Sequence, residues 1–166
     1  MQHTRYFIRP ATSNELPLLR ELDDAAGVLY ERAGTTLNLP PDNEFVVSES
    51  VRWQRCLEAG TTLIACDRDG AAVGFAAVGR LDEAPYLDQL SVRPAHMRAG
   101  LGTALLQAAT RLVDDGRSQA FWLTTYDHFA WNRPFYEKNG FVQVPEPAQR
   151  IAMRRQLLNA DSRTTG

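Results

Sequence analysis

The segment from Leu87 to Leu106, LDQLSVRPAHMRAGLGTALL, carries the clearest chemical signal in the chain. A strand-like stretch leads into a short loop, two glycines and then a helical pattern. The first N–H groups of a helix have no partner within the helix, and the helix dipole places partial positive charge there. Gly100 and Gly102 lack Cβ atoms, which lets a phosphate approach the backbone. With Arg93 and Arg98 adding positive charge, the segment predicts an anion site.

A G-x-G at a helix start is a weak signal by itself, because a plain turn with small packing residues has the same pattern. A Walker loop is excluded, since no Gly-Lys-Ser/Thr follows. A dinucleotide-binding fingerprint is also disfavoured, because Leu105 stands where its third glycine belongs. Taken alone, the pattern therefore leaves an anion-binding turn and a packing turn open.

A second group of chemically useful side chains lies between Asn132 and Phe141. Pro134 near the start and Gly140 at the end are typical of a short helix. Tyr136 follows Asn132 by four residues, so the two side chains share one helix face. Without further context, Tyr136 is equally well a core aromatic residue whose hydroxyl finds a partner.

Hydrophobic periodicity and turn residues predict the elements that position these residues. The expected strands are residues 5–10, 61–67, 71–80, 84–92, 120–126, 141–144 and 150–157. The expected helices are residues 15–30, 48–59, 99–116 and 132–139. Thr12 and Glu15 have the spacing of a capping box, and Asp69-Gly70 predicts a tight hairpin. The order predicts an α+β domain around one mixed sheet.

Composition narrows the class of protein. The 166 residues, 44% of them apolar, suit one globular domain, which we place at residues 1–158 with a flexible tail at 159–166. A net charge of −2 gives no basic field for nucleic acid, and no apolar run approaches the roughly 20 residues of a membrane span. The two cysteines and three histidines show no metal-ligand spacing. We therefore expect a cytoplasmic protein without a structural metal.

Two motifs together resemble the GNAT superfamily of N-acetyltransferases. The first is V-x-P-x-x-x-R-x-G-x-G-T-A-L-L from Val92, and the second is W-N-x-P-F-Y-E-K-N-G-F from Trp131. The resemblance covers nearly the whole chain in element order and is specific in residues 92–103 and 132–141. It implies the GNAT acyl-CoA N-acyltransferase fold, a central mixed twisted sheet of about six to seven strands flanked by about four helices.

The resemblance implies acetyl-CoA as co-substrate, with no metal. The pyrophosphate would bind the glycine loop and helix start, namely Met97, Arg98, Ala99, Gly100, Leu101, Gly102 and Thr103. The pantetheine would lie beside the preceding strand like an added strand. There the backbone of Leu90, Ser91 and Val92 would pair with its amides and polarise the thioester carbonyl. Asn132 would contact the cofactor as well.

The loop departs from the family pattern at one position. The family usually has Arg or Gln where this chain has Met97, with Arg98 one place later. Because backbone amides supply most of the binding, we expect affinity for CoA to survive. His96, in the same loop, is expected to contact CoA rather than the acceptor.

The resemblance also implies that the amine attacks the thioester directly, with Tyr136 donating a proton to the departing CoA thiolate. A base must take a proton from the amine, because a protonated amine is a poor nucleophile. Asp88 is the predicted base, and His128 and a water relay are the alternatives. Strand alternation would place Asp88 with Leu90, opposite Gln89. A solvated or salt-bridged role for Asp88 stays equally open.

The acceptor pocket is expected at the first two helices and the loop between them. Acidic and aromatic residues gather there, namely Glu21, Asp23, Asp24, Tyr30, Glu31, Phe45 and Trp53. Carboxylates beside aromatic rings suit a cationic amine, although a solvated acidic face explains any single residue more simply. We expect a small-molecule or peptide amine as acceptor, and neither nucleic acid nor membrane as partner. Many proteins of this fold self-associate, and a homodimer stays open.

Two other functions fit the same residues. One is an acyl-CoA-binding or regulatory domain that keeps the cofactor groove without transfer. The other is an acetyltransferase acting on charged tRNA, which the net charge of −2 disfavours.

Overall fold

The computed structural model describes residues 5–28, 39–126, 132–144 and 150–156. In chain order the elements are β1 (Tyr6–Pro10), α1 (Leu16–Ala26), α3 (Glu44–Glu58), β2 (Thr62–Asp67), β3 (Ala72–Leu81), β4 (Ala84–Val92), the 3-10 turn η1 (Pro94–His96), α4 (Leu101–Val113), β5 (Ala120–Tyr126), α5 (Asn132–Lys138), β6 (Val142–Val144) and β7 (Arg150–Gln156). This order confirms the predicted succession of strands and helices. The predicted tail at 159–166 lies outside the described residues.

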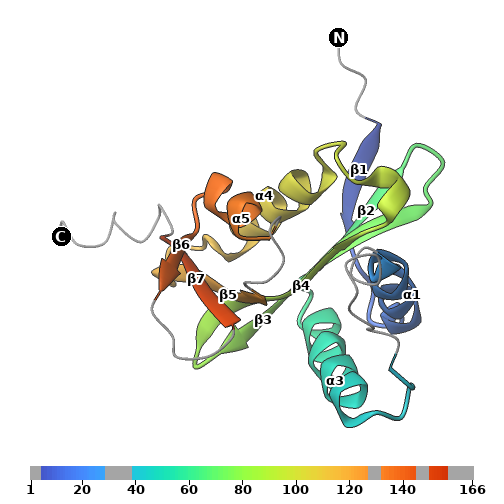
Figure 1. Ribbon diagram of the computed structural model, residues 1–166, viewed down its shortest axis with the longest axis horizontal. Coiled ribbons are helices and arrows are strands. Elements are labelled where there is room, and N and C mark those ends of the chain that lie inside the picture. Colours follow the sequence, from blue (N-terminus) through green and yellow to red (C-terminus); the bar gives the residue numbers. More distant parts are fainter. Residues whose placement is uncertain (1–4, 29–38, 127–131, 145–149, 157–166) are drawn as a thin grey trace.

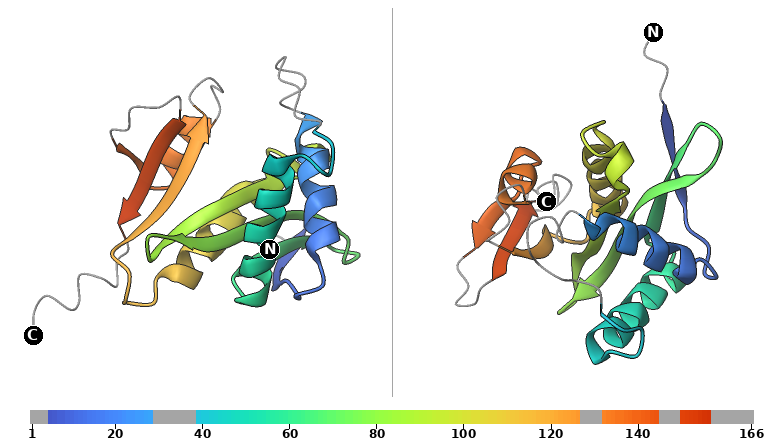
Figure 2. Two further views of the ribbon diagram at one scale, coloured as in Figure 1. Left: turned by 90° about the horizontal axis from the view of Figure 1, so that it is seen from below. Right: turned by 45° about the vertical axis from the view of Figure 1, so that its right-hand side comes forward.

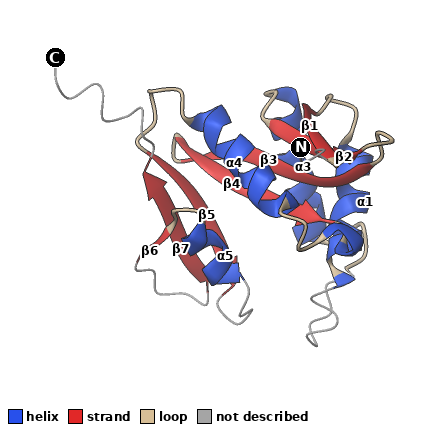
Figure 3. Ribbon diagram, turned by 90° about the horizontal axis from the view of Figure 1, so that it is seen from above, coloured by secondary structure: helices blue, strands red, loops and turns tan. Residues whose placement is uncertain are grey.

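The strands form one seven-stranded sheet in the order β1-β2-β3-β4-β5-β7-β6. The β4–β5 pair is parallel, and each of the other neighbouring pairs is antiparallel. The predicted mixed sheet is therefore confirmed. Figure 3 shows its strong twist, with β5, β6 and β7 turned away from the strands β1 to β4.

Two apolar layers cover the two faces of the sheet. Helices α1 and α3 lie on one face and α4 on the other, as Figures 1 and 2 show. The α1/α3 layer is built on Leu19, Leu22 and Trp53, all fully buried. The α4 layer is built on Leu101, Leu105, Leu106, Ala109 and Val113, the periodic residues of that helix. Within the described residues, no helix combines the length and apolar character that a bilayer crossing requires.

The ends of the elements follow from local hydrogen bonds. Helix α3 begins at Glu44, four residues before the predicted start, because the side chain of Asn43 accepts the Phe45 N–H at 2.9 Å and caps it. The Thr12 N–H donates to Glu15 at 2.8 Å, which is one half of the predicted capping box, although α1 begins only at Leu16. The predicted hairpin forms between β2 and β3, with Gly70 at a φ of 86°.

Candidate active site

The site lies where the two parallel strands of the sheet separate. Tyr86 and Trp122 are the one aligned pair between β4 and β5, and the Tyr86 hydroxyl donates to Thr124 Oγ1 at 2.8 Å. On its other edge, β4 stays paired with β3 as far as Val92. Among the described strands, the β5-facing backbone of β4 beyond Tyr86 therefore has no strand partner. An extended ligand can add to such an edge as a strand does.

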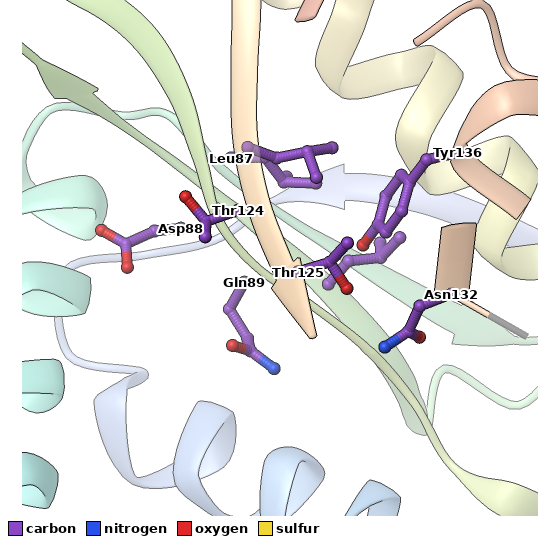
Figure 4. Close-up of a pocket in the computed structure, with 9 residues that line it drawn as sticks. Leu87, Asp88, Gln89, Thr124, Thr125, Asn132 and Tyr136 are labelled. Carbon is purple, nitrogen blue, oxygen red and sulfur yellow. The ribbon is translucent and has the colours of Figure 1, made fainter. Parts of the chain in front are cut away.

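A cavity of about 110 Å³ opens in this gap (Figure 4). It is lined from β4 by Leu87, Asp88, Gln89 and Leu90, from β5 by Leu123, Thr124 and Thr125, and from α5 by Asn132 and Tyr136. Four residues that the sequence predicted for the site, Asp88, Leu90, Asn132 and Tyr136, thus line one cavity. Residues from three separate elements meet there.

Helix α5 presents Asn132 and Tyr136 to the cavity on one face, which confirms the prediction from their spacing. The Tyr136 ring is half-buried and packs edge-on against Phe135 and Phe141, with ring centroids 5.1 and 5.8 Å apart. Its hydroxyl points into the space between the strands (Figure 4). The aromatic packing fixes the ring, so that the hydroxyl is held in a defined place.

The loop before α4 has the geometry of an open anion site. Gly100 is the N-cap of α4 at a φ of 79°, and a Cβ placed there would meet nothing within 4 Å. Arg98 also has a positive φ, 64°, and is exposed. Met97, by contrast, packs against the core under α4. The backbone at the helix start is therefore accessible, while the side chain that departs from the family pattern serves the core.

The model of a family described as "Acetyltransferase (GNAT) domain" matches residues 58–143. The chain belongs to the GNAT acetyltransferase family. The match includes the glycine loop, both separating strands and the helix that carries Tyr136. The α+β fold and the family expected from the two motifs are confirmed.

Solved acetyltransferases share the fold of this GNAT chain. One is PaiA N-acetyltransferase from Thermoplasma acidophilum in complex with coenzyme A, 18% identical, with a TM-score of 0.70 and coverage of 91% of this chain and 98% of that one. A second is the ribosomal-protein-S18-alanine N-acetyltransferase from Escherichia coli, 18% identical, with a TM-score of 0.67 and coverage of 92% and 94%. A third is Ard1 from Thermoplasma volcanium, 17% identical, with a TM-score of 0.67 and coverage of 93% and 99%.

A β-bulge in β4 changes which way Asp88 of this GNAT domain points. Ala77 pairs with Gln89 and Val78 with Leu87, so Asp88 is an extra residue without a partner on β3. Its carboxylate accepts the Arg52 Nε–H at 3.1 Å and is 9% exposed. Asp88 and Gln89 thus both point to the α1/α3 side, and the alternation that placed them on opposite faces was wrong. Alternation fails because the bulge inserts one residue.

Asp23 of α1 is hydrogen-bonded directly to β4. Its Oδ1 accepts from Gln89 Nε2 and from Ser91 Oγ, each at 2.9 Å. Burial, and next the nearby Glu49 carboxylate, raise the pKa of Asp23 from 3.8 to about 6. The sequence placed Asp23 among the acidic residues of the acceptor side but contained no signal for its link to β4, because the partners lie 66 and 68 positions apart.

Two residues that the sequence placed beside the cofactor, Arg93 and His96, bond to other parts of the protein. Arg93 donates to Glu21 Oε1 at 2.6 Å and to the carbonyl of Ala72 at 3.0 Å. Its charge is thus directed toward α1 rather than toward the α4 start. His96 Nδ1 lies 2.9 Å from the Tyr6 hydroxyl, and the two rings meet edge to face. His96 therefore connects η1 to the edge strand β1.

The remaining residues expected near the acceptor separate into distinct environments. Trp53 is fully buried against Phe75 and belongs to the core, whereas Phe45 is exposed. Asp24 is exposed on α1. Tyr30, Glu31 and the alternative base His128 lie outside the described residues.

Proposed function

We propose that this GNAT chain is an acetyl-CoA-dependent N-acetyltransferase that transfers an acetyl group directly to a primary amine. The observation that carries the proposal is the cavity in which Tyr136 and Asn132 face the unpaired edge of β4. Membership of the family supports acyl transfer, and the relative crystallised with coenzyme A supports an acyl-CoA donor. The relative named for the alanine of a ribosomal protein supports a peptide amine as one acceptor class, beside small amines.

The residues of the loop and of β4 suit a CoA-like ligand. Backbone N–H groups at the start of α4 favour a pyrophosphate, and the segment Met97–Thr103 would hold it, with Arg98 adding charge. Because the Met97 side chain packs in the core, its contribution there comes from the backbone. The backbone of Leu90, Ser91 and Val92 would pair with pantetheine amides, since the β5-facing edge of β4 is unpaired there.

The proposed reaction needs positioning, a polarised carbonyl and two proton movements. The amine nitrogen forms a bond to the acetyl carbon, the carbon–sulfur bond breaks, and the amine gives up a proton. Backbone N–H groups of β4 stabilise the oxygen that gains negative charge. Tyr136 gives its hydroxyl proton to the departing thiolate, for which its place in the cavity is suited.

Asp88 is our candidate for taking the proton from the amine, because it lines the same cavity. Its carboxylate is held toward α3 by Arg52, and Figure 4 shows it directed away from Tyr136. The proton path to Asp88 therefore needs a bridging water. Replacing Asp88 with Asn removes the base while keeping a hydrogen-bond acceptor for Arg52.

The test is thiol release from acetyl-CoA across a panel of small amines and amino-terminal peptides. Wild type is expected to release CoA with at least one of them, and Tyr136→Phe to lower kcat by about 10²-fold or more at an unchanged KM for acetyl-CoA. Tyr6→Phe is the matched control, because it removes a tyrosine hydroxyl that lies outside the cavity and, within the described residues, bonds to His96 of η1.

Three outcomes would each contradict a part of the proposal. An unchanged kcat in Tyr136→Phe would end the general-acid assignment. Tight CoA binding without thiol release by wild type would favour the alternative of an acyl-CoA-binding domain. An unchanged rate in Asp88→Asn would remove that residue as the base and leave His128 and a water relay as the alternatives.

A further inference from the structure

The side chain of Gln89 on β4 is held by hydrogen bonds to Asp23 and Ser91. It lines the cavity that contains Tyr136, while its side chain points toward α1 (Figure 4). The amide nitrogen donates one hydrogen to Asp23 Oδ1 at 2.9 Å and the other to Ser91 Oγ at 3.0 Å. The Ser91 hydroxyl then donates to the same Asp23 oxygen at 2.9 Å. Both amide hydrogens of Gln89 are thus engaged.

These hydrogen bonds determine whether the nitrogen or the oxygen of the Gln89 amide faces Asp23. The oxygen and nitrogen of a glutamine look alike in shape, so hydrogen-bond chemistry must assign them. An ionised carboxylate only accepts hydrogen bonds, and therefore the nitrogen of Gln89 must face Asp23. The carbonyl oxygen Oε1 is consequently turned away from Asp23 and Ser91. A carbonyl oxygen fixed in this way can accept a hydrogen bond from an N–H group.

We propose that Gln89 binds the acceptor amine, its Oε1 accepting an N–H hydrogen bond that orients the nitrogen for attack, and that Asp23 is a positioning residue acting through Gln89. The inference rests on the proposed function, because it names the group that receives the amine. It assigns to Asp23 a role that differs from direct charge attraction. The two carboxylates beside β4 then have separate tasks, since Asp88 bonds to Arg52 instead.

The charged groups around Asp23 make its hold on Gln89 dependent on pH. On α1 the neighbours are Arg20 and Asp24, and on α3 the neighbour is Glu49. Arg20 is committed to Glu49 by a 2.7 Å hydrogen bond. Burial and Glu49 therefore outweigh Arg20, and the pKa of Asp23 rises to about 6. Below that pH a protonated Asp23 is itself a donor, so the Gln89 amide is free to turn around.

The kinetic test uses spermidine and an alanyl tetrapeptide as probe amines. Gln89→Met keeps the side-chain length and removes the amide, both its oxygen and its nitrogen. We expect KM for the amine to rise by about tenfold while KM for acetyl-CoA stays within about twofold. Asp23→Asn should raise KM for the amine by a smaller factor. The double variant should be no worse than Gln89→Met, because Asp23 acts through Gln89.

Matched controls separate these effects from general loss of structure. Gln54→Met removes a glutamine amide on α3 that bonds to Ser13 and Glu58, and Glu58→Gln removes an exposed carboxylate. Neither is expected to change KM for the amine. Additive losses in the double variant, or a loss confined to KM for acetyl-CoA, would overturn the proposal.

If wild type acetylates neither probe amine, that result counts against the proposed function for those amines. A second measurement, of binding, still tests the role of Gln89 in that case. The side-chain amide nitrogen signal of Gln89 is followed by NMR in the protein bound to CoA. Added spermidine should shift this signal but not that of Gln54. The Gln89 signal should also titrate near pH 6 in wild type and not in Asp23→Asn. A Gln89 signal that does not shift with spermidine would refute amine binding there. A Gln89 signal that is the same in Asp23→Asn as in wild type at every pH would refute positioning by Asp23.

Discussion

The carboxylates of Asp88 and Asp23, both near β4, have different hydrogen-bond partners and therefore different environments. Asp88 has the guanidinium of Arg52, whereas Asp23 has two neutral donors and the carboxylate of Glu49 nearby. An adjacent cation compensates the loss of hydration that burial causes, and neutral donors compensate it less. Burial and the nearby Glu49 carboxylate therefore raise the pKa of Asp23 to about 6. Two carboxylates on one sheet face thus have distinct chemistry.

The Arg9–Glu15 pair yields a prediction about stability and pH. Two hydrogen bonds of 2.8 Å from Arg9 lower the pKa of Glu15 from 4.5 to about 2. A depressed carboxylate pKa contributes stability above the unfolded value, and this contribution is lost as pH falls through the folded value. After allowance for solvent screening, we expect Glu15→Gln to lower the free energy of unfolding by about 1 kcal/mol at pH 7.

Urea denaturation of wild type and Glu15→Gln at pH 7, 4 and 2.5 would check this. The difference in unfolding free energy should shrink between pH 4.5 and about 2. Glu58→Gln, at an exposed carboxylate of α3, should show little difference at any of these values. If wild type and Glu15→Gln differ in unfolding free energy by the same amount at all three pH values, the ion pair is not the source of the difference.

At the scale of elements, the loop and α4 together form the unit to which we assign anion binding. Leu101 and Leu105 bury the apolar face of the helix, which fixes its direction against β2, β3 and β4. Gly100 then allows the chain to enter the helix with a left-handed turn. Gly100 itself is exposed, with nothing within 4 Å of an added Cβ, so the proposed phosphate can approach the first N–H groups of α4 from there.

A pair of glycines tests this unit. Gly100 and Gly70 both have a positive φ, 79° and 86°, and an added Cβ would meet nothing within 4 Å at either. Each change to alanine should therefore cost about 1 kcal/mol of stability through backbone strain. Only Gly100→Ala is expected to weaken CoA binding, because only Gly100 lies at the start of α4. The Kd for CoA, measured by calorimetry, should rise roughly tenfold. Equal CoA affinity in the two variants would contradict the assignment of the loop.

At the scale of the whole molecule, the domain consists of two parts joined at one end. One part is β1 to β4 with α1, α3 and α4, and the other is β5 to β7 with α5. The aligned pair Tyr86–Trp122 and a shared core under α4, including Phe121 and Phe141, connect them. Beyond this connection the strands separate, and the cavity lies between the parts. A ligand in the gap would contact both of them.

Hydrogen exchange tests whether CoA bridges the two parts. Because a ligand stabilises the state that it binds, amides that it contacts open less often. CoA should therefore slow exchange most at the end of β4, at the start of α4 and in α5. The edge strand β1 and its neighbour β2, which lie far from the gap in the sheet order, serve as the internal control. Equal protection in β1 and α5 would refute a bridging ligand.

Local sequence determined much of this protein. The glycine loop before α4, the short helix with Asn132 and Tyr136 on one face and the Asp-Gly hairpin all follow from residues within a few positions of one another. Helix periodicity, φ preferences and capping are local effects, which is why sequence predicts them. The start of α3 was misplaced because the prediction began the helix at Ser48 and overlooked the equally local cap that Asn43 provides.

Tertiary structure decided the partners of the charged groups. The bulge at Asp88 arises from the register between β3 and β4, which depends on how both strands pack and not on either pattern alone. Likewise Asp23 meets Gln89, Arg93 meets Glu21 and Arg52 meets Asp88 only because folding brings α1 and α3 onto one face of the sheet. Hydrogen bonds and charge interactions act over a few ångströms in space, so positions distant in the chain carry no signal of them until the fold places them together.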